Sequence, residues 1–199
     1  MAPDPDAALM LAFQAGDESA FRALFEKHGR AMMAFCNRFV RDPARAEELA
    51  QDVFLKVHQG ASRYQPSARF STWLYRIATN HCLNEVRRGE YQARPQIDPE
   101  SPDGAPLDPD ALPGDGATPE DSARGRALAA EVDRLLARLP EKQRAAFVLA
   151  RLEGLSYEEV ADVLETTVPA VKSLVHRATV AAAEALAAWT STAVPGVRT

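Results

Sequence analysis

Residues Leu155 to Ala178 read LSYEEVADVLETTVPAVKSLVHRA, and their spacing is the most informative structural pattern in the chain. Ser156 and Glu159 form the Ser-x-x-Glu pattern of a capping box, which predicts a short helix over residues 157–164. Three residues later, Thr167 is placed to cap a second helix. The inward-facing residues, at helical spacing, are Ala161 in the first helix and Val171, Val175 and Ala178 in the second. This pattern predicts a helix-turn-helix, and the alternative is an ordinary helical hairpin with a polar face.

The outward face of the second helix carries side chains that suit duplex DNA, because a recognition helix meets base edges and phosphates in the major groove. These residues are Lys172, Ser173, His176 and Arg177. Upstream, the apolar stripe Leu128, Val132, Leu135, Leu136 and Leu139 predicts a helix that Pro140 breaks. A further helix is expected from Glu141 to about Glu153, with Gly154 as its stop.

The N-terminal half of the chain predicts a second helical unit. Asp17 is placed to cap a helix whose apolar residues are expected in the core, namely Phe21, Leu24, Phe25, Met32, Phe35 and Phe39. Asp42 and Pro43 open a helix that closes at Gly60. Its outer row is formed by Glu48, Gln51, Asp52 and Leu55. This row is either a solvated acidic face or a docking surface for a basic partner helix.

A third helix of this unit is expected from Phe70 to Arg88, with Gly89 as its stop. At 100° per residue its inner side holds Leu74, Tyr75, Ala78, Cys82 and Val86. The other side gathers Trp73, Arg76, Asn80, Asn84, Arg87 and Arg88. Amides and guanidinium groups read base edges and hold phosphates, and an aromatic ring can stack on an unpaired base. The alternative is a solvated basic face, with Trp73 in the core.

Charge is distributed unevenly over the 199 residues, although the formal net charge is only −5. Residues 21–92 are basic, whereas residues 93–123 hold eight acids, one base and seven of the fourteen prolines. A segment of that composition buries little apolar surface and is expected to stay disordered, with solubility as a simpler role.

We therefore predict an all-α fold, with two small helical domains joined by a flexible acidic Pro-rich linker. The expected boundaries are an N-terminal extension (1–16), a first domain (17–92), the linker (93–125), a helix-turn-helix domain (126–189) and a flexible tail (190–199).

Several functional classes are disfavoured by what the sequence contains. Cys36 and Cys82 are far apart and in no metal-ligand spacing, so we expect a reducing, cytoplasmic location and no metal site. Neither a signal peptide nor a transmembrane helix is expected, and no insertion into a membrane. No Gly-x-Ser-x-Gly, phosphate loop or His-x-x-x-His spacing occurs, so we expect no catalytic residue, no cofactor and no enzyme.

Three motifs, taken in order, carry a resemblance to a known family. They are AEELAQDVFLKV over residues 46–57, FSTWLYRIATN over residues 70–80, and LPEKQR over residues 139–144 followed by the helix-turn-helix. The chain closely resembles bacterial RNA polymerase sigma factors of the extracytoplasmic-function (ECF) group, over residues 17–92 and 127–180. The resemblance implies regions 2 and 4 of a sigma factor and a role in promoter recognition and melting.

The resemblance also implies partners for each candidate residue. Glu48, Gln51, Asp52 and Leu55 would bind the beta-prime clamp helices of core RNA polymerase, and the beta flap would be a further contact of the chain. The loop over residues 60–68 and the face from Trp73 to Arg88 would open and read the minus-ten element. The recognition-helix residues Lys172, Ser173, His176 and Arg177 would contact the minus-thirty-five element. An anti-sigma factor is a further partner to be expected.

Two positions depart from the family pattern. Family members usually have a glycine in the helix-turn-helix turn, where this chain has Glu165, and an arginine where it has Leu174. A non-glycine residue in a left-handed turn costs roughly 1 kcal/mol, which a fold absorbs. Two other functions compete with a sigma factor. An ordinary repressor or activator would need neither the acidic row nor the Trp73 face, and a helical scaffold would bind protein only.

Overall fold

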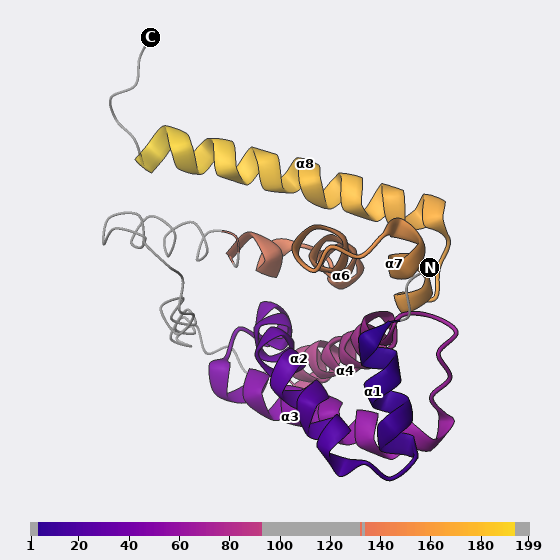
Figure 1. Cartoon of the computed structure of the whole chain (residues 1–199). Helices are drawn as coiled ribbons and strands as arrows, with labels where there is room; N and C mark the ends of the chain where they lie inside the picture. Colours follow the sequence, from indigo (N-terminus) through magenta and orange to yellow (C-terminus); the bar gives the residue numbers. More distant parts are fainter. Residues whose placement is uncertain (1–3, 93–131, 133, 194–199) are drawn as a thin grey trace, which may run out of the picture.

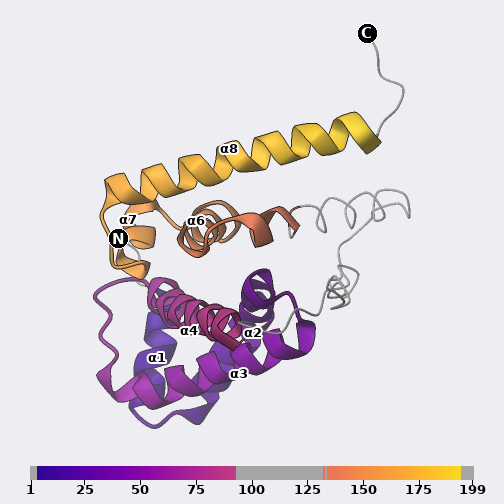
Figure 2. The same cartoon turned by 180° about the vertical axis from the view of Figure 1, so that it is seen from behind.

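A computed structural model describes residues 4–92, 132 and 134–193, and within these ranges all regular structure is helical. The N-terminal unit contains α1 (Pro5–Gln14), α2 (Glu18–Val40), α3 (Pro43–Gly60), the short 3-10 helix η1 (Ala61–Arg63) and α4 (Phe70–Gln92). The C-terminal unit contains α6 (Glu141–Phe147), the π-helical turn η3 (Val148–Leu152), α7 (Tyr157–Val163) and α8 (Val168–Ala193). The all-α prediction is confirmed, and the predicted linker (93–125) lies outside the described residues. Figures 1 and 2 show the two units stacked, with α8 along the outer side.

The predicted helix starts are confirmed by their capping hydrogen bonds. The Asp17 carboxylate accepts from the backbone N–H of Ser19 at 2.9 Å, and Asp42 caps α3 with Pro43 at its first position. Ser156 and Glu159 form the predicted capping box at the start of α7. These bonds satisfy backbone donors that the first turn of a helix leaves without partners.

The structure adds a helix to the segment expected as an N-terminal extension. Helix α1 begins with Asp4 as its cap and Pro5 at its first position, the same signal that opens α3. Met10 is fully buried, and Phe13 packs against Phe21 with ring centroids 4.8 Å apart. Helix α1 therefore belongs to the N-terminal helical domain.

The core of the N-terminal domain lies between α2, α3 and α4. Its fully buried side chains include Leu24, Met32, Phe35, Leu49, Val53 and Leu74. Phe25 was expected in this core and is instead 46% exposed, because it lies at the edge of the α2 stripe. Its one aromatic neighbour among the described residues is the buried Phe54, with ring centroids 4.8 Å apart. Cys36 and Cys82 meet inside the core, with their sulfur atoms 3.6 Å apart.

Two predicted helix ends differ from the structure. Gly89 does not stop α4, which continues to Gln92, because Gly89 stays out of the left-handed conformation that ends a helix. The cost of a helical glycine, about 1 kcal/mol, is small enough for a long packed helix to absorb. At the other end of the chain, α8 continues to Ala193, past the expected domain boundary at residue 189.

The helix expected over residues 141–153 changes its winding half-way. Helix α6 ends at Phe147, and a π turn follows in which the Glu153 N–H donates to the Val148 carbonyl at 3.0 Å. Gly154 then takes the left-handed conformation, with φ of 72°, and confirms the predicted stop.

The helix-turn-helix is confirmed in its packing. Val171, Val175 and Ala178 are fully buried, and Ala161 faces inward as predicted. Glu165 takes φ of 50°, the left-handed turn position at which the family usually has glycine. Among the described helices, none has the length and apolar character needed to cross a membrane.

The buried carboxylate of Asp6 gives a prediction about acid stability. Asp6 is 7% exposed and binds Lys27 at 2.6 Å and His28 at 2.9 Å. Burial pushes the pKa of Asp6 upward, but the hydrogen bonds and charges of Lys27 and His28 outweigh it and lower this pKa below its ordinary value of 3.8. Asp6→Asn is expected to lower the free energy of unfolding by about 1 to 2 kcal/mol at pH 6.

The advantage of wild type over Asp6→Asn should be complete above about pH 4 and should shrink as the pH falls through the lowered pKa. Denaturant unfolding at several pH values between 6 and 3 measures this difference. Glu26→Gln, at an exposed position of α2, is the control that should show no such trend. A wild-type advantage independent of pH would contradict the role of the Asp6 charge.

Candidate nucleic-acid interface

Helix α4 presents the predicted polar face to the surface of the molecule. Arg76, Asn80, Asn84, Arg87 and Arg88 are all exposed, while Leu74, Ala78 and Cys82 are buried on the opposite side. The helical period that sends apolar side chains inward places the amides and guanidinium groups outward. One side of this helix therefore holds a set of hydrogen-bond donors and acceptors with positive charge.

Trp73 is shared between the core and this face. Its ring is half-buried, 5.0 Å from the Tyr64 ring and 6.0 Å from the Phe70 ring. The indole also packs beside Gly60 at the end of α3, where an added Cβ would lie 3.5 Å from it, in ordinary van der Waals contact. The structure thus combines the two alternatives that the sequence left open, a core residue and an exposed aromatic.

A cavity of about 240 Å³ opens beside Trp73. It is lined by Gln65, Ser67, Ala68, Thr72, Trp73, Arg76 and Asp162. The first three come from the loop that precedes α4, and Asp162 comes from α7 of the other domain. A cavity smaller than the ~300–1,000 Å³ typical of drug-sized ligands suits one planar group the size of a base.

Tyr64 packs against Trp73 and is a neutral aromatic side chain. Burial raises the pKa of Tyr64 to about 12, and the negative charges of Asp4 and Asp6 add to the effect. The phenol therefore stays protonated at neutral pH. Sequence reasoning did not single out Tyr64, although its place in an otherwise polar loop is a detectable signal.

The predicted acidic row lies on the exposed side of α3. Glu48, Gln51, Asp52 and Leu55 are exposed together, and Leu55 is 55% accessible. Arg45 pairs with Glu48, and His81 contacts Asp52 at 3.1 Å, so part of the negative charge is compensated within the domain. The row combines polar groups with one exposed leucine, as a protein-binding surface does.

Three of the four candidate residues on the predicted recognition helix are exposed to solvent. Lys172, His176 and Arg177 are exposed in the first turns of α8, and Ser173 is half-buried. The Arg177 guanidinium donates to the Ser173 hydroxyl at 3.0 Å. The four side chains therefore share one face, as the helical spacing predicted.

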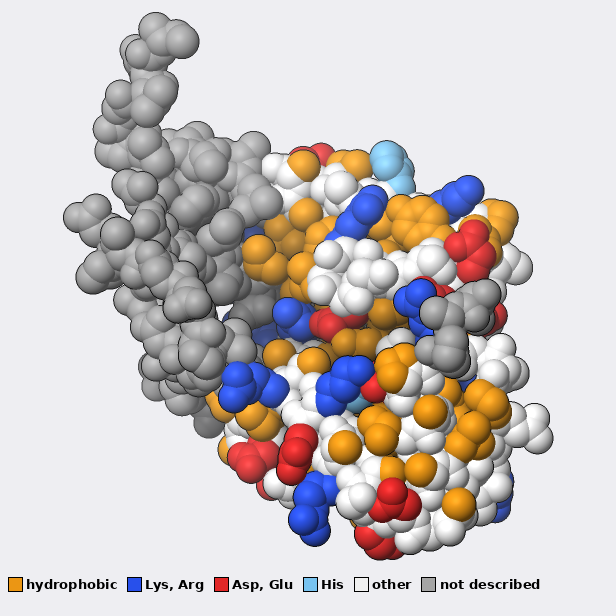
Figure 3. Space-filling model, in the orientation of Figure 1, with side chains coloured by type: hydrophobic (Ala, Val, Ile, Leu, Met, Phe, Trp, Pro, Cys, Tyr) orange, Lys and Arg blue, Asp and Glu red, His pale blue; other side chains and the backbone are white. Residues whose placement is uncertain are grey.

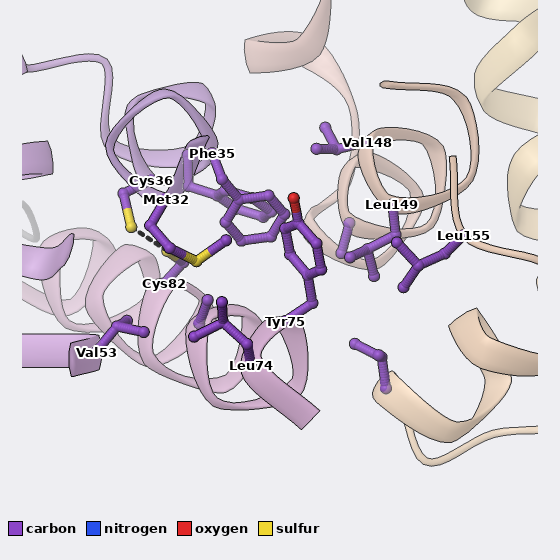
Figure 4. Close-up of a cluster of buried hydrophobic side chains, with 14 of the residues drawn as sticks. Met32, Phe35, Cys36, Val53, Leu74, Tyr75, Cys82, Val148, Leu149 and Leu155 are labelled. Carbon is purple, nitrogen blue, oxygen red and sulfur yellow. Dashed lines mark hydrogen bonds between the residues drawn. The ribbon is translucent and has the colours of Figure 1, made fainter. Parts of the chain in front are cut away.

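The two domains meet through a carboxylate that the sequence did not reveal. Glu153, at the end of the π turn, accepts a hydrogen bond from Arg38 of α2 at 2.8 Å and another from the Tyr75 hydroxyl of α4. Burial first, and then the bond to Glu153, raises the pKa of Tyr75 above its ordinary range. In Figure 4 the Tyr75 ring stands between Phe35 of its own domain and Leu149 of the other, at the boundary between the domains.

A buried arginine strengthens the same boundary. Arg144 is only 8% exposed. Its guanidinium donates to the Phe39 carbonyl at 3.1 Å and to the Ala137 carbonyl at 3.0 Å. Phe39 lies in the last turn of α2, where carbonyl groups lack helical partners and attract a cation. Arg144 thereby links that helix end to the C-terminal domain.

Contacts at the rim engage residues of the candidate DNA face. Arg87 binds the Glu141 carboxylate, with its Nε at 3.0 Å, and Thr72 donates to Glu159 at 3.3 Å. In Figure 3, basic and acidic side chains lie next to one another along this boundary. The closed arrangement therefore engages one residue of the predicted DNA face, Arg87, whose side chain stays 52% exposed, and one residue of the cavity wall, Thr72.

Comparison with known proteins assigns the two domains. Residues 24–91 match the family described as Sigma-70 region 2, and residues 129–180 match Sigma-70, region 4. The chain is 34% identical over 184 residues to the RNA polymerase sigma-H factor of Pseudomonas aeruginosa, covering 92% of this chain and 94% of that protein. The chain belongs to the sigma-70 family, as an ECF sigma factor. It directs RNA polymerase to promoters for transcription initiation, and sigma factors are non-catalytic subunits that bind core polymerase and DNA.

Other relatives agree with this assignment. The ECF RNA polymerase sigma-E factor of Escherichia coli (strain K12) is 30% identical, over 87% of this chain and 90% of the relative. A structure of CnrH in complex with the cytosolic domain of CnrY superposes with a TM-score of 0.68 at 23% identity, covering 92% of this sigma factor and 97% of that chain. The sigma factor RpoE of Bartonella quintana, in complex with the anti-sigma factor NepR, superposes with a TM-score of 0.64 at 23% identity. The match covers 83% of this sigma factor and 96% of that chain. Both structures support the fold.

The interface between the domains yields a testable prediction. Glu153→Ala removes the acceptor of Arg38 and of the buried Tyr75 hydroxyl, which is expected to weaken the closed arrangement by about 1 to 3 kcal/mol. The free sigma factor should then be larger on average in small-angle X-ray scattering, with unchanged helicity. Glu158→Ala, an exposed acidic position on α7, is the matched control. Identical radii of gyration for wild type and Glu153→Ala would contradict the role of Glu153.

Proposed function

We propose that region 2 of this sigma factor melts and holds the minus-ten element against α4 and the preceding loop. The observation that carries the proposal is the region 2 wall of the cavity, formed by loop residues Ser67 and Ala68 and helix residues Trp73 and Arg76, which remains when Asp162 of α7 moves away with the other domain. Unpairing bases costs a few kcal/mol, which stacking on an aromatic ring and contacts to arginine offset, at about 1 to 3 kcal/mol per stacked base. The cavity supplies both kinds of group for one unpaired base.

The rest of the α4 face extends this site along the DNA strand. Asn80 and Asn84 lie one turn apart and offer amide groups to base edges. Arg87 and Arg88 lie one further turn along the helix, where their guanidinium groups meet phosphates. A repressor that binds only duplex DNA needs no such face, so this observation favours promoter opening.

Region 4 is proposed to bind the minus-thirty-five element as duplex DNA. Lys172, Ser173, His176 and Arg177 form its candidate face at the start of α8. Lys172 and Arg177 bind phosphates and so fix the position of the helix on the DNA, while Ser173 and His176 face the base edges. Leu174, half-buried, replaces the arginine usual in the family and removes one donor from this helix.

Core polymerase is proposed to dock on the row of Glu48, Gln51, Asp52 and Leu55 through its beta-prime clamp helices, with the beta flap as a further contact. The support is an exposed leucine within a polar, partly compensated acidic surface. We also infer action in the cytoplasm, where a polymerase subunit meets its promoters. An anti-sigma partner is proposed by analogy with the RpoE–NepR complex from Bartonella quintana.

Binding both promoter elements at once requires the domains to separate. The two elements lie about 25 base pairs apart, or about 85 Å along B-form DNA at about 3.4 Å per base pair. In the structure α4 touches α7, with Thr72 and Glu159 at 3.3 Å. The 33 residues between 93 and 125 can span roughly 110 Å when extended at about 3.3 Å per residue. The sequence between the domains is thus long enough for an open state.

The docking proposal is tested by Gln51→Ala combined with Asp52→Ala. These outward side chains contribute little to folding, so the variant should stay folded while its affinity for core polymerase falls by roughly tenfold. A titration of labelled sigma factor with core polymerase measures the affinity. Glu184→Ala, exposed on α8, should bind like wild type. Wild-type affinity of the double variant would remove the docking role.

The melting proposal is tested by Arg76→Ala combined with Asn80→Ala. Both residues are exposed, so this variant avoids the half-buried Trp73 and its packing. The holoenzyme should still form a closed complex but show little permanganate-reactive thymine near the start site, because fewer groups hold the opened strand.

The control is Lys172→Ala combined with Arg177→Ala. It should weaken upstream binding and reduce its salt dependence, since phosphate neutralisation sets that slope, while opened complexes remain reactive. Wild-type reactivity in the Arg76 and Asn80 double variant would refute the melting role of this face. An unchanged salt slope in the control would refute the recognition-helix assignment.

A further inference from the structure

The two ends of helix α1 hold the two ends of the loop that lines the cavity. At the C-terminal end, the Gln14 side-chain amide donates to the Ala61 carbonyl and, at 2.9 Å, to the Tyr64 carbonyl. At the N-terminal end, the Asp4 carboxylate accepts from the backbone N–H of Phe70 at 2.7 Å. The segment between these contacts, residues 61–69, contains all three loop residues of the cavity wall.

Asp4 acts on two helices at once. One of its oxygens accepts from the Asp6 N–H at 3.0 Å and caps α1, and the other accepts from Phe70 at the start of α4. A carboxylate at a helix N-terminus satisfies a free donor and is favoured by the helix dipole. The position of α1 and the first turn of α4 are therefore coupled through a single side chain.

The loop itself has little to hold it in place. Gln65, Ser67 and Ala68 are exposed, and the only large buried side chain between residues 61 and 69 is Tyr64. Segments with few buried apolar contacts open most readily, so their conformation depends on neighbouring fixed points. Gln14 and Asp4 supply such points at either end.

Helix α1 is firmly anchored to the rest of the domain. Met10 is fully buried, and the Phe13 ring lies 5.0 Å from the His58 ring of α3. The buried Asp6 carboxylate binds Lys27 at 2.6 Å and His28 at 2.9 Å, both on α2. A helix fixed to α2 and α3 in this way can act as a rigid support for the loop.

We propose that α1 is a brace that fixes residues 61–69 in the conformation that reads an unpaired base of the minus-ten element, with Asp4 and Gln14 as positioning residues. The inference rests on the proposed melting role of region 2. Neither side chain lines the cavity, so both act through the backbone of the loop. Pre-organisation of a binding loop improves selectivity because the loop does not have to be ordered during binding.

The test compares base discrimination by holoenzymes that contain full-length variants. A promoter and its derivatives with single substitutions in the minus-ten element compete for open-complex formation, which gives a discrimination ratio for each variant. Gln14→Glu keeps size and exposure but removes the donor, and Asp4→Ala removes the shared acceptor. Each should lower the ratio by roughly tenfold, the loss expected when one base contact is no longer held in place. Core-polymerase affinity should stay at the wild-type level.

Three further variants make the result specific. Asp17→Ala removes the cap of α2, a contact of the same kind that does not touch the loop, and should keep wild-type discrimination. Asp4→Ser retains one oxygen that can cap α1 but offers none for the Phe70 N–H, so it should keep most of the loss seen with Asp4→Ala. Gln65→Ala combined with Ser67→Ala alters the cavity wall directly and should lower the ratio.

Each outcome bears on a different claim. Wild-type discrimination by the Asp4 and Gln14 variants, with loss in the Gln65 and Ser67 variant, would overturn the brace and leave the reading role of the loop intact. Equal loss in Asp17→Ala would also overturn it, because a general decrease in stability would then explain the effect. Unchanged discrimination in the loop variant would refute the reading role, and the brace with it.

Discussion

The closed arrangement of this sigma factor depends on the need of a buried carboxylate for partners. Glu153 has a side chain only 11% exposed, and both of its partners, Arg38 and Tyr75, come from the other domain. While the domains are docked, loss of either partner would leave this charge buried and poorly compensated, so the two hydrogen bonds hold the π turn that carries Glu153 against α2 and α4. The wide winding of residues 148–152 places the carboxylate at the boundary, and Gly154 lets the chain turn away toward α7.

The local features of the fold were accessible from the sequence, because they depend on neighbours a few residues away. Caps at Asp17, Asp42 and Ser156 and the inward stripes of α4 and α8 follow from backbone donors and helical periodicity alone. The faces of the candidate site followed from the same periodicity. The Asp4–Pro5 signal was equally local, so α1 could have been expected from the same reasoning.

The features that sequence reasoning missed are those set by distant partners. Nothing in the sequence distinguishes Arg38, Arg144 and Glu153 from ordinary charges on helix surfaces. Their partners across the domain boundary exist only when the domains dock. Gly89 carries the signal of a helix stop, but the signal acts only if the residue adopts a left-handed conformation. The loop before α4 was expected to act on the promoter, yet its contacts with α1 join residues about 50 or more positions apart in the chain.

Helix α4 has two faces with opposite surroundings, the domain core on one side and solvent on the other. Its inner face is dry and packed, whereas its outer face exposes the amide and guanidinium groups that we propose to bind a strand of DNA. In the closed arrangement, the Glu141 carboxylate occupies Arg87 in the two-oxygen manner in which a guanidinium also binds a phosphate. If Arg87 binds DNA as proposed, the domain contact and the nucleic acid compete for the same side chain, and binding of one disfavours the other.

The paired sulfur atoms of Cys36 and Cys82 bear on how this protein responds to oxidants. The thiolate is the form that reacts with peroxides, and the hydrogen bond to Cys36 together with burial raises the pKa of Cys82 well above its ordinary value. Both side chains are fully buried between α2 and α4. In the folded sigma factor the Cys82 thiol is therefore held protonated, and burial keeps both sulfur atoms away from oxidants in the solvent, so their reaction requires the packing between α2 and α4 to open.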